Sequence, residues 1–176
     1  SGGQPVEVDE TYYNETKRSK ARGRKGSKID KMKIVALVER GGQLRAFHVA
    51  RTNAKNVAPI MREQIAKQAR LMTDESKIYI TVGKEFAEHQ SVNHTAKEYA
   101  RGDAHVNNLE SFFNILKRGL VGTYHHVGEQ HLRRYVQEFG FRYNHRETKI
   151  KVNGKWEKAG FSDAERAHAA LKSIGG

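Results

Sequence analysis

The first half of the chain contains short apolar segments separated by polar residues, a pattern typical of β-strands. The segments with this pattern are residues 6–10, 32–39, 43–50 and 70–73. Gly41 and Gly42 separate the second segment from the third, and glycine supplies the positive φ angles that tight hairpin turns need. Residues 78–82 are rich in β-branched side chains and fit either a strand or a helix beginning near Ser76. Residues 90–93 fit a short edge strand.

Other segments repeat apolar residues at helical spacing. Residues 54–67, 107–118 and 129–144 have this pattern clearly, and residues 162–172 have it more weakly. The segment 107–118 is two-sided. Its apolar face carries Leu109, Phe112, Phe113 and Leu116, and its polar face carries Asn107, Glu110, Asn114 and Lys117. The order strand, hairpin, helix, strand, helix, helix predicts an α/β domain with a central mixed sheet flanked by helices.

The charge of the chain favours a polyanionic partner. Its 176 residues include 32 lysines and arginines against 20 aspartates and glutamates, a formal net charge of +12. This excess favours phosphate contacts through counterion release, and it also fits a basic protein whose charge only keeps it dispersed. The densest cationic stretch is 17–33, where Asp30 is the one acid. We interpret it as an arm that grips DNA, with a merely solvated loop as the alternative.

Several classes of protein are excluded or disfavoured. Cysteine is absent, which excludes disulfides and cysteine-based zinc sites. No apolar run approaches the roughly 20 residues needed to span a bilayer, and no signal peptide is visible. We therefore expect a cytoplasmic protein with no membrane partner. The chain opens with Ser1-Gly2-Gly3, so residues 1–5 are expected to be a linker or an artificial remnant.

Short motifs in a fixed order resemble a known family. The motifs are Val-Asp-Glu-Thr-Tyr at 8–12, Thr-Asp-Glu at 73–75, Val-Asn-His at 92–94, the segment 105–118, Gly-Thr-Tyr-His-His-Val at 122–127, and 131–132 through 141–146. Together they resemble the catalytic domain of bacterial insertion-sequence transposases of the ISXO-like group, in the DDE superfamily, over residues 6–146. The group tends to have paired glycines where this chain has Tyr13-Asn14. The resemblance implies an RNase H-like fold, with two aspartates on the sheet and a third ligand on a following helix.

The resemblance also implies a metal site for phosphoryl transfer to and from DNA. Asp9 corresponds to the first aspartate and Asp74 to the second. The third position corresponds to Glu110 or to Asn107, one helical turn apart, and the choice stays open. The spacing to Lys117 favours Glu110, whereas the asparagine often reported in this group favours Asn107. These residues would bind two Mg²⁺ or Mn²⁺ ions, which prefer oxygen ligands, and Lys117 would contact a DNA phosphate beside the scissile bond.

The acidic and amide candidates have simpler alternatives. Asp9 and Asp74, at strand ends, fit residues that cap turns. Asn107 fits a helix N-cap. Glu10 and Glu75 are expected to face solvent on the opposite side, because adjacent strand residues alternate between faces.

Basic residues and histidines supply the predicted DNA contacts. These are Lys17, Arg18, Lys20, Arg22, Arg24, Lys25, Lys28, Lys117, Arg118, His125, His126, Arg133 and Arg134. Lys117 and Arg118 also fit an ordinary cationic helix end. The histidines at 125, 126 and 131 fit DNA contacts or structural roles better than a zinc site, because no acidic or cysteine partner accompanies them.

The sequence therefore predicts a DDE-type transposase catalytic domain at 6–146, with 17–33 as an inserted basic loop and 147–176 as a tail with a short helix. We expect it to cleave double-stranded DNA at insertion-sequence ends and to transfer the strands to a target. It would act on the bacterial nucleoid, as a homodimer or higher multimer, and with no organic cofactor. Two alternatives are an RNase H-fold nuclease without strand transfer and an inactive basic DNA-binding domain.

Overall fold

A five-stranded mixed sheet forms the centre of the protein. The computed structural model describes residues 4–14, 31–92, 106–125, 127–146, 148–153 and 155–174. The strands are β1 (Val6–Asn14), β2 (Lys31–Glu39), β3 (Leu44–Val49), β4 (Arg70–Asp74) and β5 (Glu88–Val92), in the order β3-β2-β1-β4-β5. β2 runs antiparallel to β1 and β3, whereas β1, β4 and β5 are parallel. β1 is therefore the middle strand, with β4 beside it.

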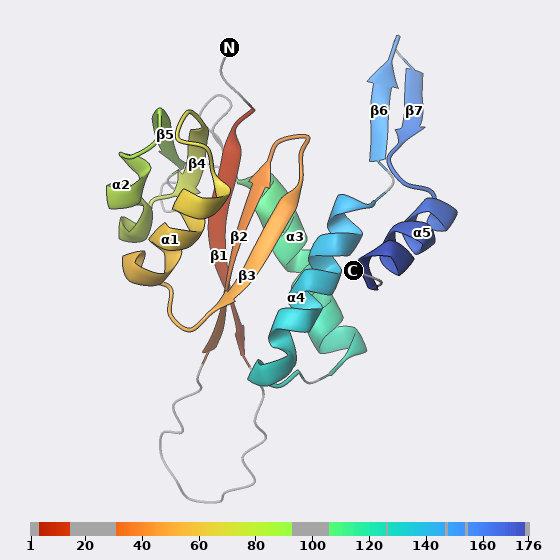
Figure 1. Cartoon of the computed structure of the whole chain (residues 1–176), viewed down its shortest axis with the longest axis horizontal. Coiled ribbons are helices and arrows are strands. Elements are labelled where there is room, and N and C mark those ends of the chain that lie inside the picture. Colours follow the sequence, from red (N-terminus) through yellow and green to blue (C-terminus); the bar gives the residue numbers. More distant parts are fainter. Residues whose placement is uncertain are drawn as a thin grey trace, which may run out of the picture.

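Helices cover both faces of this sheet (Figure 1). One face carries α1 (Ala54–Gln64) and α2 (Lys77–Gly83), and the other carries α3 (Asn107–Arg118) and α4 (Glu129–Asn144). A short π-helix, Gly119–Thr123, follows α3 directly. The arrangement is the mixed sheet flanked by helices that the sequence predicts, so the α/β class is confirmed.

Strand β2 is apolar on both sides because it separates the two cores. Val35 and Leu37 pack with α1 and α2, whereas Ile34, Ala36 and Val38 pack with α3 and α4. Continuous apolar runs are typical of strands that are covered on both faces. The same division decides the two sides of β1, where Val8 belongs to the first core and Tyr13 to the second.

The ambiguous segment 78–82 is helical and belongs to α2. Tyr79 and Val82 are buried, while Ile80 is 48% exposed, so the apolar side chains follow helical rather than alternating spacing. The turn begins at Asp74, whose Oδ1 accepts the backbone N–H of Ser76 at 3.0 Å. Strand β4 therefore ends at Asp74, and α2 starts immediately beyond it.

The tail contains a hairpin that the sequence analysis missed, followed by the helix that it predicted. β6 (Thr148–Val152) pairs antiparallel with β7 (Lys155–Ala159) in a separate sheet, and α5 spans Asp163–Ile174. Asn153 has φ 48°, a left-handed conformation that asparagine tolerates in turns. The hairpin adds no strand to the central sheet.

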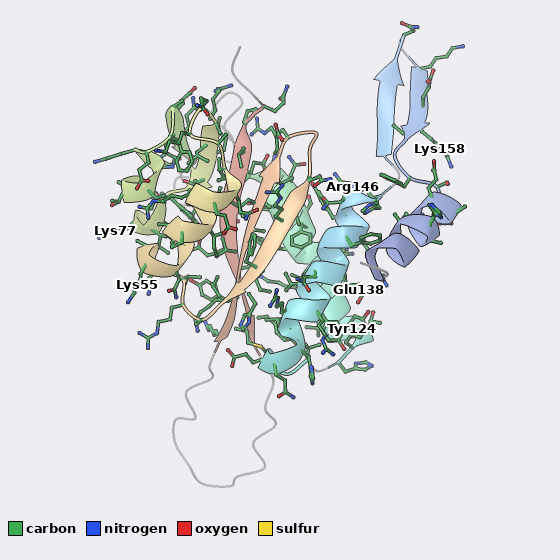
Figure 2. All side chains as sticks on the ribbon, in the orientation of Figure 1. Lys55, Lys77, Tyr124, Glu138, Arg146 and Lys158 are labelled. Atoms are coloured by element: carbon green, nitrogen blue, oxygen red, sulfur yellow. The ribbon has the colours of Figure 1, made fainter. Side chains whose placement is uncertain are left out.

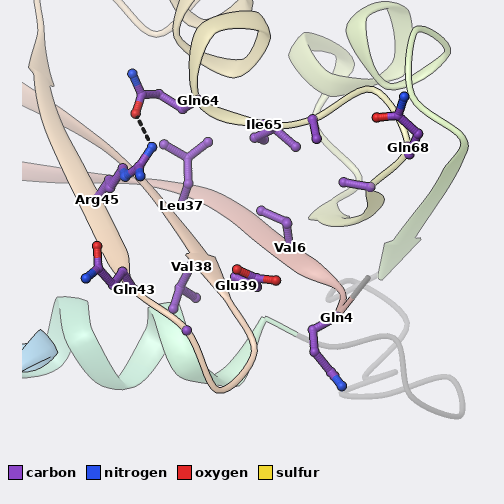
Figure 3. A pocket seen from close by; sticks show the side chains of 13 residues that line it. Gln4, Val6, Leu37, Val38, Glu39, Gln43, Arg45, Gln64, Ile65 and Gln68 are labelled. Carbon is purple, nitrogen blue, oxygen red and sulfur yellow. Dashed lines mark hydrogen bonds between the residues drawn. The ribbon is translucent and has the colours of Figure 1, made fainter. Parts of the chain in front are cut away.

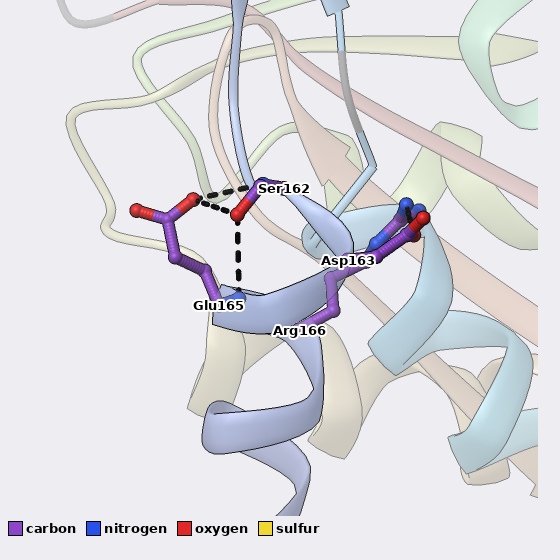
Figure 4. Close-up of polar contacts among 4 residues, drawn as sticks. All are labelled: Ser162, Asp163, Glu165 and Arg166. Carbon is purple, nitrogen blue, oxygen red and sulfur yellow. Dashed lines mark hydrogen bonds and ion pairs between the residues drawn. The ribbon is translucent and has the colours of Figure 1, made fainter.

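A capping box explains where α5 begins (Figure 4). The Ser162 hydroxyl accepts the Glu165 backbone N–H at 3.3 Å, and the Glu165 carboxylate accepts the Ser162 backbone N–H at 2.8 Å. Asp163 and Arg166 form an ion pair beside them. Two backbone donors at the helix start are thus satisfied reciprocally.

Part of the predicted DNA-contacting set cannot be placed. The residues outside the described part of the chain are Lys17, Arg18, Lys20, Arg22, Arg24, Lys25, Lys28 and His126.

Two strands differ in their bounds from the prediction. Strand β1 extends to Asn14, beyond the predicted end at residue 10, and β5 spans 88–92 rather than 90–93. In the described part of the chain, no helix is long and apolar enough to cross a membrane.

Candidate active site

Two aspartates lie side by side where β1 and β4 meet. The parallel pairing sets Val8 beside Thr73, so Asp9 and Asp74 are the next residues on neighbouring strands. Oxygen atoms of Asp9, Glu10 and Asp74 all lie within 4.8 Å of one another. The structure thus gathers three carboxylates at the carboxyl end of β4.

The position of Glu10 differs from the sequence-based expectation. Glu10 was expected on the solvent side of β1, opposite Asp9, but it is half-buried and belongs to the acidic group. Strand β4 stops at Asp74 while β1 continues, so side chains from both faces of β1 can reach the space beyond the end of β4. The hydroxyl of Tyr79, a fully buried residue of α2, donates a hydrogen bond to Glu10 Oε2.

Backbone hydrogen bonds orient the two aspartates. Asp9 Oδ1 accepts the N–H of Glu10 at 2.7 Å, and Asp74 Oδ1 accepts the N–H of Ser76 at 3.0 Å. The buried Thr73 hydroxyl donates to the Asp74 carbonyl oxygen at 2.7 Å and lies 2.9 Å from His89 Nε2. Backbone N–H groups therefore hold the two aspartate carboxylates, and the Thr73 hydroxyl holds the backbone at Asp74.

The surroundings of Asp9 and Glu10 disfavour the ionised forms of these two carboxylates. Burial, and then the charges of Asp74, Glu10 and Glu110, raise the pKa of Asp9 to about 7, against the opposing hydrogen bond from the Glu10 N–H. Burial, together with the charge of Asp74, also raises the pKa of Glu10, and the Tyr79 hydrogen bond opposes that shift. Among the described residues, no lysine or arginine forms an ion pair with the three carboxylates.

This donor set fits a divalent cation. Mg²⁺ and Mn²⁺ are hard ions that prefer carboxylate oxygens. A cation between the carboxylates would compensate both the burial and the carboxylate repulsion that raise the pKa of Asp9.

Helix α3 brings the remaining candidates toward the site. Its predicted apolar face is buried, and Asn107, Glu110, Asn114 and Lys117 are exposed on its polar face. The charge of Glu110 acts on Asp9. Asn107 is the first residue of the helix, whereas Val106 holds the N-cap position, so the alternative that Asn107 is the N-cap is wrong.

A buried polar group ties the start of α3 to β1. Glu7 is fully buried on the same side of β1 as Asp9. It accepts hydrogen bonds from the Asn108 N–H at 3.1 Å, Asn108 Nδ2 at 2.8 Å and Arg40 Nε at 3.0 Å. The sequence analysis did not single out these three residues. The one signal in the sequence was an acid at the alternate strand position before Asp9.

Comparison with known proteins identifies the family. The profile of the ISXO2-like transposase domain matches residues 1–144. The chain belongs to this family. A transposase-like protein of Haemophilus influenzae is 24% identical over 105 residues, which cover 60% of this chain and 84% of that protein.

Two solved structures were also matched, a pre-cleavage Mos1 transpososome and the Mos1 strand transfer complex. Each has a TM-score of 0.37 and 10% identity, over 80% and 81% of this chain respectively. This transposase domain spans only about half of those chains, 54% and 53%. The division of the chain into a domain at 6–146 and a tail at 147–176 stays a prediction.

Basic side chains lie on several surfaces of the transposase domain. Figure 2 labels Lys55 and Lys77 on α1 and α2, and Arg146 just after α4. The predicted DNA contacts Arg118, His125, Arg133 and Arg134 are exposed, and so is His131. The described residues offer no histidine-containing metal cluster. Positive charge is therefore spread over the surface rather than confined to one helix.

A separate cavity of about 510 Å³ lies away from the acidic group (Figure 3). It opens between the ends of β2 and β3 and the end of α1, where Arg45 donates to Gln64 Oε1 at 2.6 Å. None of Asp9, Glu10 and Asp74 lines it. The carboxylate group, and not this cavity, is the candidate active site.

Proposed function

We propose that this chain is the catalytic domain of a DDE-type transposase, which cleaves DNA at the ends of an insertion sequence and joins them to a target. The observation that carries the proposal is the group of carboxylates around Asp9, gathered within 4.8 Å without a lysine or arginine partner among the described residues. The family to which the chain belongs supports it.

Asp9 and Asp74 would hold the divalent cations, Mg²⁺ or Mn²⁺. When bound, two such ions activate the attacking oxygen and stabilise the leaving oxygen of a phosphodiester. The hydrogen bonds from the backbone N–H groups of Glu10 and Ser76 keep the two aspartates oriented before the metal arrives. Preformed orientation matters because the metal then need not order its own ligands.

Glu110 is the better candidate for the third position. Its charge acts on Asp9, and it lies on the exposed face of α3 together with Lys117. Asn107 lies one turn earlier on the same face and could coordinate through its amide oxygen, without adding charge. Lys117, two turns beyond Glu110, would contact a DNA phosphate next to the reacting bond.

Double-stranded DNA is the proposed substrate. The net charge of +12 favours contacts to its phosphates. Arg118 follows Lys117 at the end of α3, and Arg133 and Arg134 are exposed on α4, so they would extend the phosphate contacts. We further propose that two or more copies assemble on the DNA ends.

A plasmid assay tests the function. Supercoiled plasmid and a labelled oligonucleotide with a free 3′-hydroxyl are incubated with the protein and Mn²⁺, and both nicking and joining are measured. We expect nicking and joining to fall to background in Asp9→Asn and Asp74→Asn, and to persist in the control Glu63→Gln, which changes an exposed residue of α1. DNA binding should survive in all three variants.

The other outcomes separate the alternatives. Nicking without joining would identify a nuclease and overturn the transposase assignment. DNA binding with no metal-dependent nicking in the wild type would identify a binding domain. Nicking that persists in both aspartate variants would place the chemistry elsewhere.

A further inference from the structure

We propose that Glu10 is an additional ligand of the metal site and that the buried hydroxyl of Tyr79 holds it there. The inference rests on the proposed function, because it concerns the same cations. It assigns a role to the residue immediately after the first aspartate and to one residue of α2.

Glu10 lies close enough to the two aspartates to share an ion with them. Among the described residues, the carboxylates close enough to share one ion are those of Asp9, Asp74 and Glu10. Glu110 influences Asp9 by its charge but is not part of that close group. The third nearby carboxylate therefore comes from β1 itself rather than from α3.

Glu10 is also held in place by a buried hydroxyl group. Tyr79 is fully buried in the core between the sheet and α1, and its hydroxyl donates to Glu10 Oε2. A carboxylate has about four lone-pair sites, so Glu10 can accept this bond and still coordinate a cation. Hydrogen bonds from neighbouring residues commonly orient metal ligands in this way.

Helix α2 is itself closely fitted to the sheet, which fixes Tyr79. Gly83 ends the helix against the His89 ring of β5, and a Cβ atom added at Gly83 would lie 2.2 Å from His89 Nδ1. His89 also contacts the buried Thr73 hydroxyl on β4. The hydroxyl of Tyr79 is thus presented from a helix that has little room to shift.

The competing explanation is that Glu10 only satisfies the buried Tyr79 hydroxyl. A neutral acceptor would do this without adding a negative charge next to Asp9 and Asp74. A third carboxylate is unfavourable there unless a cation compensates it.

The test measures Mn²⁺ affinity of the full chain by calorimetry and by the electron paramagnetic resonance signal of free Mn²⁺. We expect Glu10→Gln to weaken binding by about tenfold or more, and Glu10→Asp to recover part of it. The matched control is Glu75→Gln, which changes the exposed residue after Asp74 and should bind as the wild type does. Wild-type affinity in Glu10→Gln would overturn the proposal.

A double-mutant cycle tests the role of Tyr79. Tyr79→Phe should weaken Mn²⁺ binding about tenfold in the wild type and have little effect when Glu10→Gln is already present. An equal loss in both backgrounds would show that Tyr79 acts through the fold and not through Glu10. Circular dichroism checks that each variant is folded.

Failure of this inference is distinguishable from failure of the proposed function. If Asp9→Asn abolishes Mn²⁺ binding while Glu10→Gln leaves it unchanged, the metal site stands and the role of Glu10 is overturned. If Asp9→Asn and Asp74→Asn also bind Mn²⁺ normally, the proposed function fails as well.

Discussion

Strand β1 carries acidic residues in two contrasting environments, only two residues apart. Glu7 is fully buried and accepts hydrogen bonds from the Arg40 side chain and from the backbone and side chain of Asn108. Asp9 and Glu10 are half-buried beside Asp74, and none of the three pairs with a lysine or arginine of the described chain. The fold neutralises the first carboxylate and leaves the other three to repel one another.

The difference separates structural acids from candidate functional acids. A buried charge with its own cation and amide donors holds two elements together, and here it attaches the start of α3 to the middle of the sheet. Carboxylates that lie together without a cationic partner repel one another, and a bound cation would remove that repulsion. By burial alone, Glu7 would be the better candidate for a functional acid than Asp9. The hydrogen-bond and ion-pair partners of the two residues favour Asp9 instead.

The largest effect is expected when Glu7, the structural acid, is replaced. Glu7→Ala leaves Arg40 and Asn108 without their acceptor in a buried site, so we expect a loss of about 3–5 kcal/mol in the free energy of unfolding. Urea denaturation followed by circular dichroism measures it. The control Glu63→Ala, on the exposed side of α1, should change stability by less than about 0.5 kcal/mol. Similar small losses in both variants would contradict a structural role for Glu7.

The second effect concerns the uncompensated acids. Mn²⁺ at a hundred times its dissociation constant should stabilise the folded protein by about 2.7 kcal/mol, since the ion binds the folded state only. Thermal unfolding with and without Mn²⁺ measures this, and Asp74→Asn should remove the gain. Ca²⁺-free buffer and a chelator control exclude other ions. An equal Mn²⁺ gain in the variant would mean that the ion binds elsewhere.

The elements that local pattern determines were predictable from the sequence. The two-sided pattern of 107–118 predicted both faces of α3, and the apolar segment 70–73 predicted a strand with Asp74 at its end. The predicted end of the first strand was wrong, because β1 continues to Asn14 and Asp9 lies inside it. The tail hairpin was missed although its signal was present: lysines alternate with apolar residues over 149–152, and Asn153-Gly154 is a favoured two-residue hairpin turn. The segment 78–82 was left open because its burial depends on how α2 packs.

The contacts within the site were less predictable, because they depend on where strands stop. Alternation correctly puts Glu10 on the opposite face of β1 from Asp9, yet the early end of β4 lets both reach the same space. No spacing in the sequence relates Tyr79 to Glu10, or Asn108 to Glu7. Such pairs arise from tertiary packing, which overrides local preferences.

A third prediction compares the replacement of a carboxylate by an amide at Glu7 and at Asp9. Glu7→Gln should lower the free energy of unfolding by about 2 kcal/mol, because Arg40 loses a charged acceptor. Asp9→Asn, measured without metal at pH 8, should raise it by about 1 kcal/mol, because the cost of burying the Asp9 charge and its repulsion from Asp74 and Glu10 are removed. Urea titrations of the two variants measure the opposite signs. Losses in both would mean that Asp9 is compensated as Glu7 is.

The smallest expected effect is the pH dependence of the stability difference between the wild type and Asp9→Asn. The pKa of Asp9 is raised to about 7 in the folded state, so its favourable contribution is complete at acidic pH, below its unfolded pKa of about 3.9. That contribution is lost as the pH rises through 7.

The stability of the metal-free wild type minus that of Asp9→Asn should therefore fall by about 1 kcal/mol between pH 5 and pH 8, after allowance for solvent screening. His89, whose pKa is lowered by burial, is common to both proteins, so its titration cancels in the difference. Saturating Mn²⁺ at pH 8 should reverse the sign, because the metal stabilises only the protein that keeps the Asp9 carboxylate. A difference that stays flat with pH would show that Asp9 is ionised throughout, and would remove the electrostatic distinction between Asp9 and Glu7.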